Sequence, residues 1–170
     1  MEREQIRRLK HDDSPQATMI RKLMGLRAIG VGSSSLFVNE IFGWRQIRNR
    51  RQLGSLTGSI PSPYDSGQSH REQGITKSGN RHVRWMAVEI AWMWVQSQPK
   101  SALTQWFHRR FGDSNPRTRK VGIVALSRKL LVALWKYLEF DIAPEGATIV
   151  HWTTKFGRRA PAESPEVQLG

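Results

Sequence analysis

The stretch NRHVRWMAVEIAWMWVQ, at residues 80–96, decides the fold. Its apolar side chains recur every three to four residues, which predicts an α-helix. They form two stripes, with Val83 and Trp94 on the first and Trp85 and Trp92 on the second. A helix that is apolar on two sides is typical of the centre of a core. We therefore expect the other elements to pack around this helix.

Further helices are predicted on both sides of this segment. A charged helix is expected at residues 1–11, and Ser14 followed by Pro15 marks the start of the next one, because serine caps helix N-termini and proline suits the first helical position. Apolar spacing places that second helix at about residues 16–26. It predicts the remaining helices at about residues 33–42, in a short segment after Pro99, and at 118–138.

Two glycines, Gly30 and Gly32, separate the expected helices at residues 16–26 and 33–42. Glycine permits a tight turn, and backbone N–H groups in such a turn can approach a phosphate. This pattern predicts a helix-hairpin-helix. The fold class is therefore expected to be mainly α, with the helix-hairpin-helix followed by a loop and a small helical bundle.

The expected domain organisation has three parts. Residues 1–22 form an N-terminal helical connector, and residues 148–170 form a loose tail rich in Pro, Gly and charge. Between them lies the main domain at residues 23–147. It consists of the hairpin at about 23–42, a Gly-, Ser- and Pro-rich loop at about 54–79, and helices at about 80–138.

The composition points to a polyanionic partner. Lys and Arg number 27 against 14 Asp and Glu, which leaves a formal charge of +13 and a pI near 11.2. Nucleic acid is the most common partner of such a surplus. The absence of cysteine excludes disulfides and thiol nucleophiles. The sequence shows no leader and no apolar run long enough to cross a membrane, so we expect no membrane partner and a cytoplasmic location.

The sequence shows no residue pattern typical of a catalytic metal site. The carboxylates are scattered without a recurrent ligand spacing, and the five histidines form no H-x-x-x-H pair. We therefore predict no metal site and no cofactor in this chain.

Ser66 is the candidate nucleophile. It stands between Asp65 and Gly67, and a serine that attacks phosphorus needs exposure and nearby cations. The cations would come from Lys77, Arg81 and Arg84, and the helix start at Asn80 would add N–H groups. An ordinary turn also explains the Asp-Ser-Gly sequence. The residues by themselves favour the turn.

Other arginines have two interpretations each. Four of them, in a basic connector, either contact phosphates or form a solvated face, and the net charge favours phosphates. These are Arg45, Arg48, Arg50 and Arg51. Arg128 falls on the apolar stripe of the last helix. It either pairs with a carboxylate such as Glu89 or points into the phosphate site, and the sequence does not decide between the two.

Two motifs carry a resemblance to a known family. PYDSG, REQGI and GNR lie at residues 63–81, and GIVALSRKLLVALW lies at residues 122–135. With their surroundings, from about Leu23 to Ala147, they resemble the C-terminal domain of serine-dependent, bridge-RNA-guided insertion-sequence transposases. The resemblance implies that Ser66 is the nucleophile and forms a covalent phosphoserine link to DNA. It also implies DNA, a structured guide RNA and further copies of the chain as partners, and association with the bacterial nucleoid.

The chain departs from that family in two ways. Ala28 stands where the hairpin of the family has the first glycine of Gly-Ile-Gly, which we expect to weaken the approach of a phosphate. The family also has an N-terminal RuvC-like domain with four acidic residues, and only about twenty residues precede the hairpin here. Mg²⁺ is expected only through that domain, and this chain alone is expected to be inactive. The alternatives are a nucleic-acid-binding remnant without catalysis, or a basic helical scaffold that binds another protein.

Overall fold

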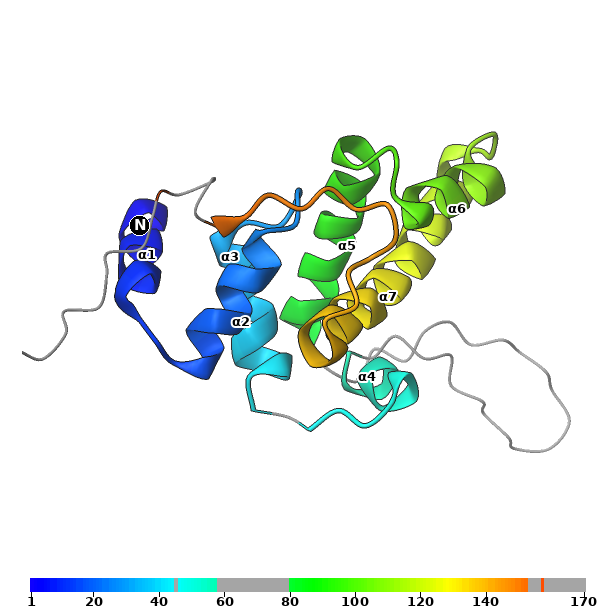
Figure 1. Cartoon of the computed structure of the whole chain (residues 1–170). Helices are drawn as coiled ribbons and strands as arrows, with labels where there is room; N and C mark the ends of the chain where they lie inside the picture. Colours follow the sequence, from blue (N-terminus) through cyan, green and yellow to red (C-terminus); the bar gives the residue numbers. More distant parts are fainter. Residues whose placement is uncertain (45, 58–79, 153–156, 158–170) are drawn as a thin grey trace, which may run out of the picture.

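The computed structural model describes residues 1–44, 46–57, 80–152 and 157. The described residues contain helices and one isolated β-bridge, and no β-strand, which confirms the prediction of a mainly α fold (Figure 1). The elements are α1 (Glu2–His11), α2 (Pro15–Met24), α3 (Val31–Phe37), the π-helical turn η1 (Val38–Phe42), α4 (Arg50–Leu56), α5 (Arg81–Ser97), α6 (Ala102–Phe111) and α7 (Pro116–Phe140). None of these helices is long and apolar enough to cross a membrane.

Helices α5 and α7 form the centre of the core. Their mutual packing is the most extensive in the molecule, and α6 packs against both of them. Trp94 of α5 is fully buried, and its Nε1 donates a hydrogen bond to Oγ of Ser101 at 3.0 Å. From α7, every third or fourth residue fills the same core, as in Leu126, Leu130 and Leu134. This periodicity explains why α7 is long and continuous.

The second apolar stripe of α5 is buried only in part, since Trp92 packs against the core and Trp85 does not. Trp85 is 60% exposed and Met93 is 50% exposed, whereas Trp92 is half-buried. The expectation that both stripes are buried is therefore wrong for Trp85. The reason is that the partners of α5, mainly α7 with α3 and α6, cover one side of the helix.

The tight turn between α2 and α3 does not depend on Gly30 and Gly32, contrary to what the sequence led us to expect. The Ile29 N–H donates to the carbonyl oxygen of Leu26 at 3.2 Å, which closes a four-residue turn whose third residue is Ala28. Ala28 has φ of 82°, a left-handed conformation that usually requires glycine. Gly30 instead has φ of −100° and caps α3. The strained position in this turn therefore belongs to an alanine.

Ala28→Gly is expected to stabilise the fold by about 0.5–1 kcal/mol, because the left-handed conformation costs an L-residue about 1–2 kcal/mol, and the greater freedom of glycine in the unfolded chain offsets part of the gain. Urea unfolding measures the change. The control is Ala133→Gly within α7, which should lose about 1 kcal/mol. Equal losses for both variants would contradict the assignment of strain to Ala28.

The chain after α7 returns to the α2–α3 turn (Figure 1). There the buried Gln98 joins two segments: its Nε2 donates to the carbonyl oxygen of Arg27 at 2.7 Å, and its Oε1 accepts from the Thr148 N–H at 2.6 Å. Leu26 and Ile149 form the isolated antiparallel bridge. At residues 148–150 the structure thus differs from the expected loose tail, because the Gln98 amide and the turn supply partners for this backbone.

Helices α6 and α7 meet at a glycine. A Cβ added to Gly122 would lie within 2.5–2.9 Å of three ring atoms of Phe111, closer than real side chains approach one another. The Phe111 ring also lies 5.8 Å from the rings of Trp106 and Phe107. The missing side chain at Gly122 therefore allows α6 and α7 to pack closely, as a helical hairpin.

Candidate nucleic-acid interface

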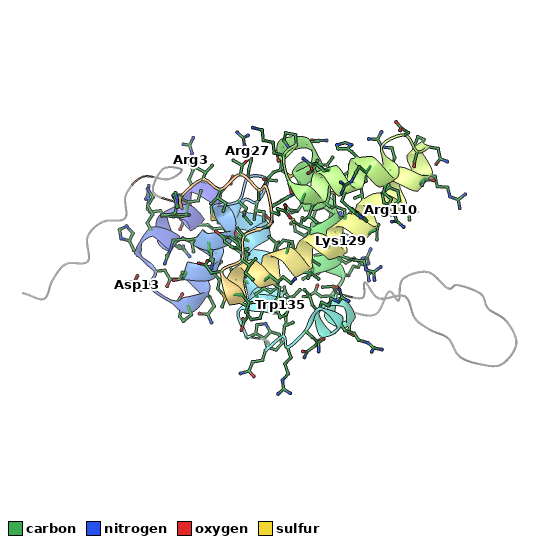
Figure 2. The ribbon with its side chains drawn as sticks, turned by 45° about the vertical axis from the view of Figure 1, so that its right-hand side comes forward. Arg3, Asp13, Arg27, Arg110, Lys129 and Trp135 are labelled. Atoms are coloured by element: carbon green, nitrogen blue, oxygen red, sulfur yellow. The ribbon has the colours of Figure 1, made fainter. Side chains whose placement is uncertain are left out.

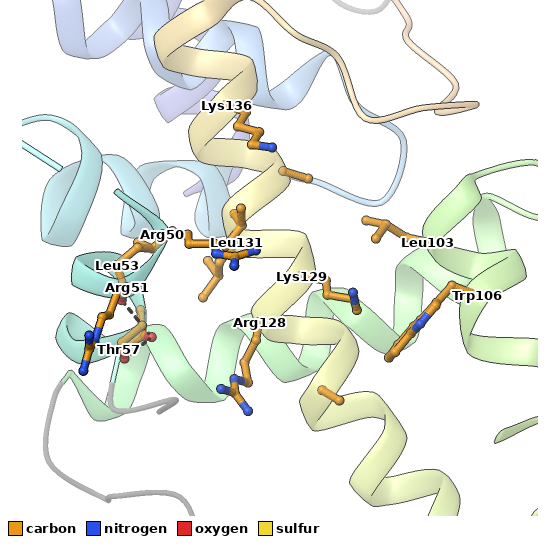
Figure 3. Close-up of a pocket in the computed structure, with 14 residues that line it drawn as sticks. Arg50, Arg51, Leu53, Thr57, Leu103, Trp106, Arg128, Lys129, Leu131 and Lys136 are labelled. Atoms are coloured by element: carbon orange, nitrogen blue, oxygen red, sulfur yellow. Dashed lines mark hydrogen bonds between the residues drawn. The ribbon is translucent and has the colours of Figure 1, made fainter. Parts of the chain in front are cut away.

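A groove of about 800 Å³ opens between α4, α6 and α7 (Figure 3). Its floor is apolar, with Leu53 from α4, Leu103 and Trp106 from α6, and Leu131 and Val132 from α7. Its rim is basic. The cations that line it are Arg50, Arg51, Arg128, Lys129 and Lys136.

Helix α4 places Arg50 and Arg51 on the rim. The Asn49 side chain caps this helix by accepting a hydrogen bond from the Gln52 N–H at 2.9 Å. Leu53 is 1% exposed and anchors the helix, which packs against α7. With Leu53 buried, the arginines at the first turn are left exposed beside the groove.

Helix α7 supplies the other three cations. Arg128 is half-buried, while Lys129 and Lys136 are exposed. The Nζ of Lys129 lies 4.7 Å from the centre of the Trp106 ring, a cation–π contact that holds the lysine over the floor of the groove. Lys129 and Lys136 are seven residues apart, two helical turns, and so share one face of α7.

The structure bears on one of the two interpretations of Arg128, the ion pair with a carboxylate. Among the described residues, ion pairs join Arg8 to Glu4 and Lys22 to Asp141, and Arg128 has none. Glu89 is exposed and does not line the groove. Arg128 instead lines the basic groove together with Arg50 and Arg51 (Figure 3), and its place in the phosphate site stays a prediction.

No carboxylate is present among the described residues that line the groove, so its five cations have no counter-charge there. Such clustered charges repel one another in the free protein, and an anionic ligand relieves the repulsion. The spacing of the cations along α4 and α7 fits an extended polyanion better than a single small anion.

Asn80, Arg81 and Arg84 lie at the start of α5 and do not line the groove. The Asn80 side chain is engaged at both ends: its Oδ1 accepts from the N–H groups of His82 and Val83, and its Nδ2 donates to Glu40 Oε2 of η1 at 2.6 Å. Arg81 is exposed. The Nη1 of Arg84 is buried and has no hydrogen-bond partner among the described residues.

The remaining predicted site residues fall into two groups. Gly30, Gly32 and Arg48 are described and exposed, and a Cβ at either glycine would meet nothing within 4 Å. Packing therefore does not require glycine at these two positions. Ser66, Lys77 and Arg45 lie outside the described residues, and their roles stay predictions.

A second hollow of about 260 Å³ lies by α2 and is lined by Lys22 and Tyr137 among others. Burial, and to a lesser extent Asp141, raises the pKa of Tyr137, and Lys22 Nζ lies 4.8 Å from its ring centre. No three His, Asp or Glu side chains of the described residues gather closely enough to hold a metal ion.

Two groove residues, Lys129 and Lys136, are absent from the sequence-based prediction. The signal for them was the seven-residue spacing beside Arg128 on the last helix. Helix α4 (Arg50–Leu56) was also not predicted, since residues 44–51 were expected to form a connector and residues 54–79 a loop. The Asn49 cap was the signal for this helix.

The chain was compared with known proteins. The family model described as "Transposase IS116/IS110/IS902 family" matches residues 20–106, just over half of the 170 residues. The chain is 39% identical over 128 residues to "Putative transposase y4rJ" of Sinorhizobium fredii (strain NBRC 101917 / NGR234), covering 75% of this chain and 32% of that protein. It is 26% identical over 137 residues to "Transposase for insertion sequence element IS1328" of Yersinia enterocolitica, covering 79% of this chain and 39% of that one.

The chain thus spans about a third of the length of these curated relatives. No solved structure matches it significantly. The family match begins within α2 and ends within α6, and so includes α4 and α5. With just over half of its residues matched, the chain belongs to the IS116/IS110/IS902 family of transposases.

Proposed function

We propose that this chain is the DNA-recombining domain of an insertion-sequence transposase, and that its basic groove holds the DNA backbone. The observation that carries the proposal is the groove itself, with five cations and no carboxylate among its described lining residues. Phosphate contacts from arginine and lysine supply most of the affinity of such proteins for nucleic acid. The membership of the family makes DNA the expected polyanion.

Ser66 is the proposed nucleophile. Its hydroxyl oxygen would attack a DNA phosphorus, form a phosphoserine ester and displace a deoxyribose oxygen, which takes up a proton. Lys77, Arg81 and Arg84 would stabilise the charge that builds on the phosphate oxygens. The Arg84 Nη1 supports this scheme, since it has no hydrogen-bond partner within the described part of the chain. The Asn80 cap, tied to Glu40, would hold the start of α5 in place.

The complete reaction would need partners beyond this chain. We propose a structured guide RNA, further copies of the chain, and a RuvC-like domain whose acidic residues would hold Mg²⁺. The complex would work on DNA in the bacterial nucleoid. The arginines of the connector, Arg45 and Arg48, and the α2–α3 turn with Gly30 and Gly32 would add contacts to the nucleic-acid backbone.

Removing two groove charges tests the DNA-binding proposal. The double variant Arg51→Gln/Arg128→Gln should bind a 25-base-pair duplex roughly 30-fold more weakly at about 0.15 M salt, because each lost phosphate contact lowers the salt slope by about 0.9. Fluorescence anisotropy at a series of salt concentrations measures both quantities.

The matched control is Arg3→Gln/Arg7→Gln on α1. It removes the same charge from exposed positions away from the groove, as Arg3 in Figure 2 shows. The control should change affinity by less than about threefold, the share expected from net charge alone. Equal losses in both variants would contradict a specific role for the groove. No binding at low salt would favour a protein-binding scaffold instead.

A further inference from the structure

A second group of cations lies at the tip of the α6–α7 hairpin. The hairpin tip consists of four exposed residues, Arg109 and Arg110 at the end of α6 and Arg117 and Lys120 at the start of α7. None of them lines the groove, and the family match ends before all of them. The proposed function assigns them no role.

The cations of the hairpin tip have no acidic partner in the part of the chain that the structure describes. None of the four forms an ion pair with a described residue. Asp113 is the sole acidic residue in the sequence between residues 102 and 120. Four like charges without partners on one short segment repel one another, and a polyanion would relieve that repulsion.

The fold holds these cations at fixed spacing. The close contact of Gly122 with Phe111 joins the two helices next to the tip. The Asn115 side chain caps α7 by accepting from the Thr118 N–H at 2.9 Å, and Pro116 follows at the first helical position. A surface held in this way loses little freedom on binding a ligand.

The hairpin tip continues the groove along α7. Arg117 and Arg128 are eleven residues apart, close to three full turns, so they lie on the same face of the helix. Between them Val121 is 62% exposed, and no acidic residue interrupts this face. On α6, Arg110 follows Trp106 by four residues and shares its face. Figure 2 shows Arg110 near the tip and Lys129 midway along α7.

The distances suit double-stranded DNA. At about 1.5 Å per residue, Arg117 and Lys136 are separated by about 28 Å along the axis of α7. That length corresponds to about eight base-pair steps of a duplex, at about 3.4 Å per step. Proteins that bind single strands usually add aromatic side chains on which bases stack. The four cations of the tip include no such platform, and the Phe111 ring beside them packs against Gly122.

We infer that the hairpin tip is a second phosphate-binding surface for the same DNA duplex that occupies the groove. The duplex lies along α7, with the groove holding one part of its backbone and the tip holding a part several base pairs away. This inference rests on the proposed function of the groove and adds to it the form of the DNA and its path across the molecule.

Charge removal at the tip tests the inference. Arg110→Gln/Arg117→Gln is compared with the groove variant and the α1 control, all of which lose two charges. On a 25-base-pair DNA duplex the tip variant should lose about 30-fold in affinity and about two units of salt slope. Because Arg117 and Arg128 are about 16 Å apart along α7, at about 1.5 Å per residue, combining the tip and groove variants should multiply the losses to about 1,000-fold. The charge-preserving Arg110→Lys/Arg117→Lys should bind within about threefold of the unchanged chain.

The outcomes separate the two proposals. If the tip variant binds DNA like the α1 control, the inference is overturned. If the groove variant still loses affinity by about 30-fold, the proposed function of the groove stands. If the groove variant binds DNA as tightly as the unchanged chain while the tip variant loses affinity, the proposed function of the groove is overturned. An equal loss on single-stranded DNA or on an RNA duplex overturns the assignment to duplex DNA. Far-UV circular dichroism confirms that each variant is folded, including the groove variant, in which Arg128 is half-buried.

Discussion

Replacing Ser66 with alanine is expected to abolish the covalent protein–DNA adduct of the proposed reaction. Alanine removes the hydroxyl oxygen that would bond to phosphorus, and no second group on the same side chain can replace it. The measurement is a denaturing gel, on which an adduct moves more slowly than the free chain and disappears after nuclease treatment. The reaction contains DNA, guide RNA and a RuvC-like domain. The adduct of the Ser66→Ala variant should fall to the background of the gel.

Ser69→Ala is the matched control, because it is the same substitution three residues further along the same segment. It should form the adduct in normal amount. An adduct that survives Ser66→Ala would disprove the assignment of the nucleophile. If neither the unchanged chain nor the control forms an adduct, although both bind DNA, a binding module without catalysis becomes the better description.

Trp94→Ala is expected to lower the free energy of unfolding by about 3–5 kcal/mol. The side chain has no exposed area, so its removal leaves a large cavity between α5 and its neighbours. It also leaves Oγ of the buried Ser101 without the Nε1 donor at 3.0 Å. A domain of this size has a total stability of about 5–15 kcal/mol, so the loss is a large share of it.

Trp85→Ala provides a control on the same helix. The same atoms are removed nine residues away, but Trp85 is 60% exposed, and we expect a change within about 1 kcal/mol. Urea unfolding followed by circular dichroism measures both variants. Similar losses for Trp85→Ala and Trp94→Ala would show that the packing of α5 differs from the one described.

Local rules predicted most helix starts correctly. Ser14 caps α2 through a hydrogen bond from the Ala17 N–H at 3.2 Å, and Pro15 occupies the first helical position. Asn80 caps α5 in the same way. These features depend on neighbouring residues, so the sequence contains all the information that they need.

Features that depend on distant contacts were beyond those rules. Trp85 and Trp94 lie on a helix that is apolar on two sides, and periodicity does not show which side α7 covers. The positive φ of Ala28 is another case, since the glycines nearby were the natural candidates for it. Its strain is accepted because the Ile29 N–H and the bridge at Leu26 hold the turn in place.

The candidate site was predicted in part. Arg50, Arg51 and Arg128 were named from the sequence, and the structure brings them together in one groove. Their proximity follows from the packing of α4 against α7, which joins residues more than seventy positions apart. Sequence spacing gives no access to a contact of that kind, and so it left the partner of Arg128 open.

The central position of α7 limits which segment of this chain can fold when it is expressed alone. The segment that matches the family model stops at residue 106, inside α6, and contains none of α7. A polypeptide cut there would leave the α7-facing side of α5 in water and would lose Leu126, Leu130 and Leu134 from its interior. A gene rearrangement that keeps a working fold must therefore carry the coding sequence onward, at least to the residues that reach Gln98.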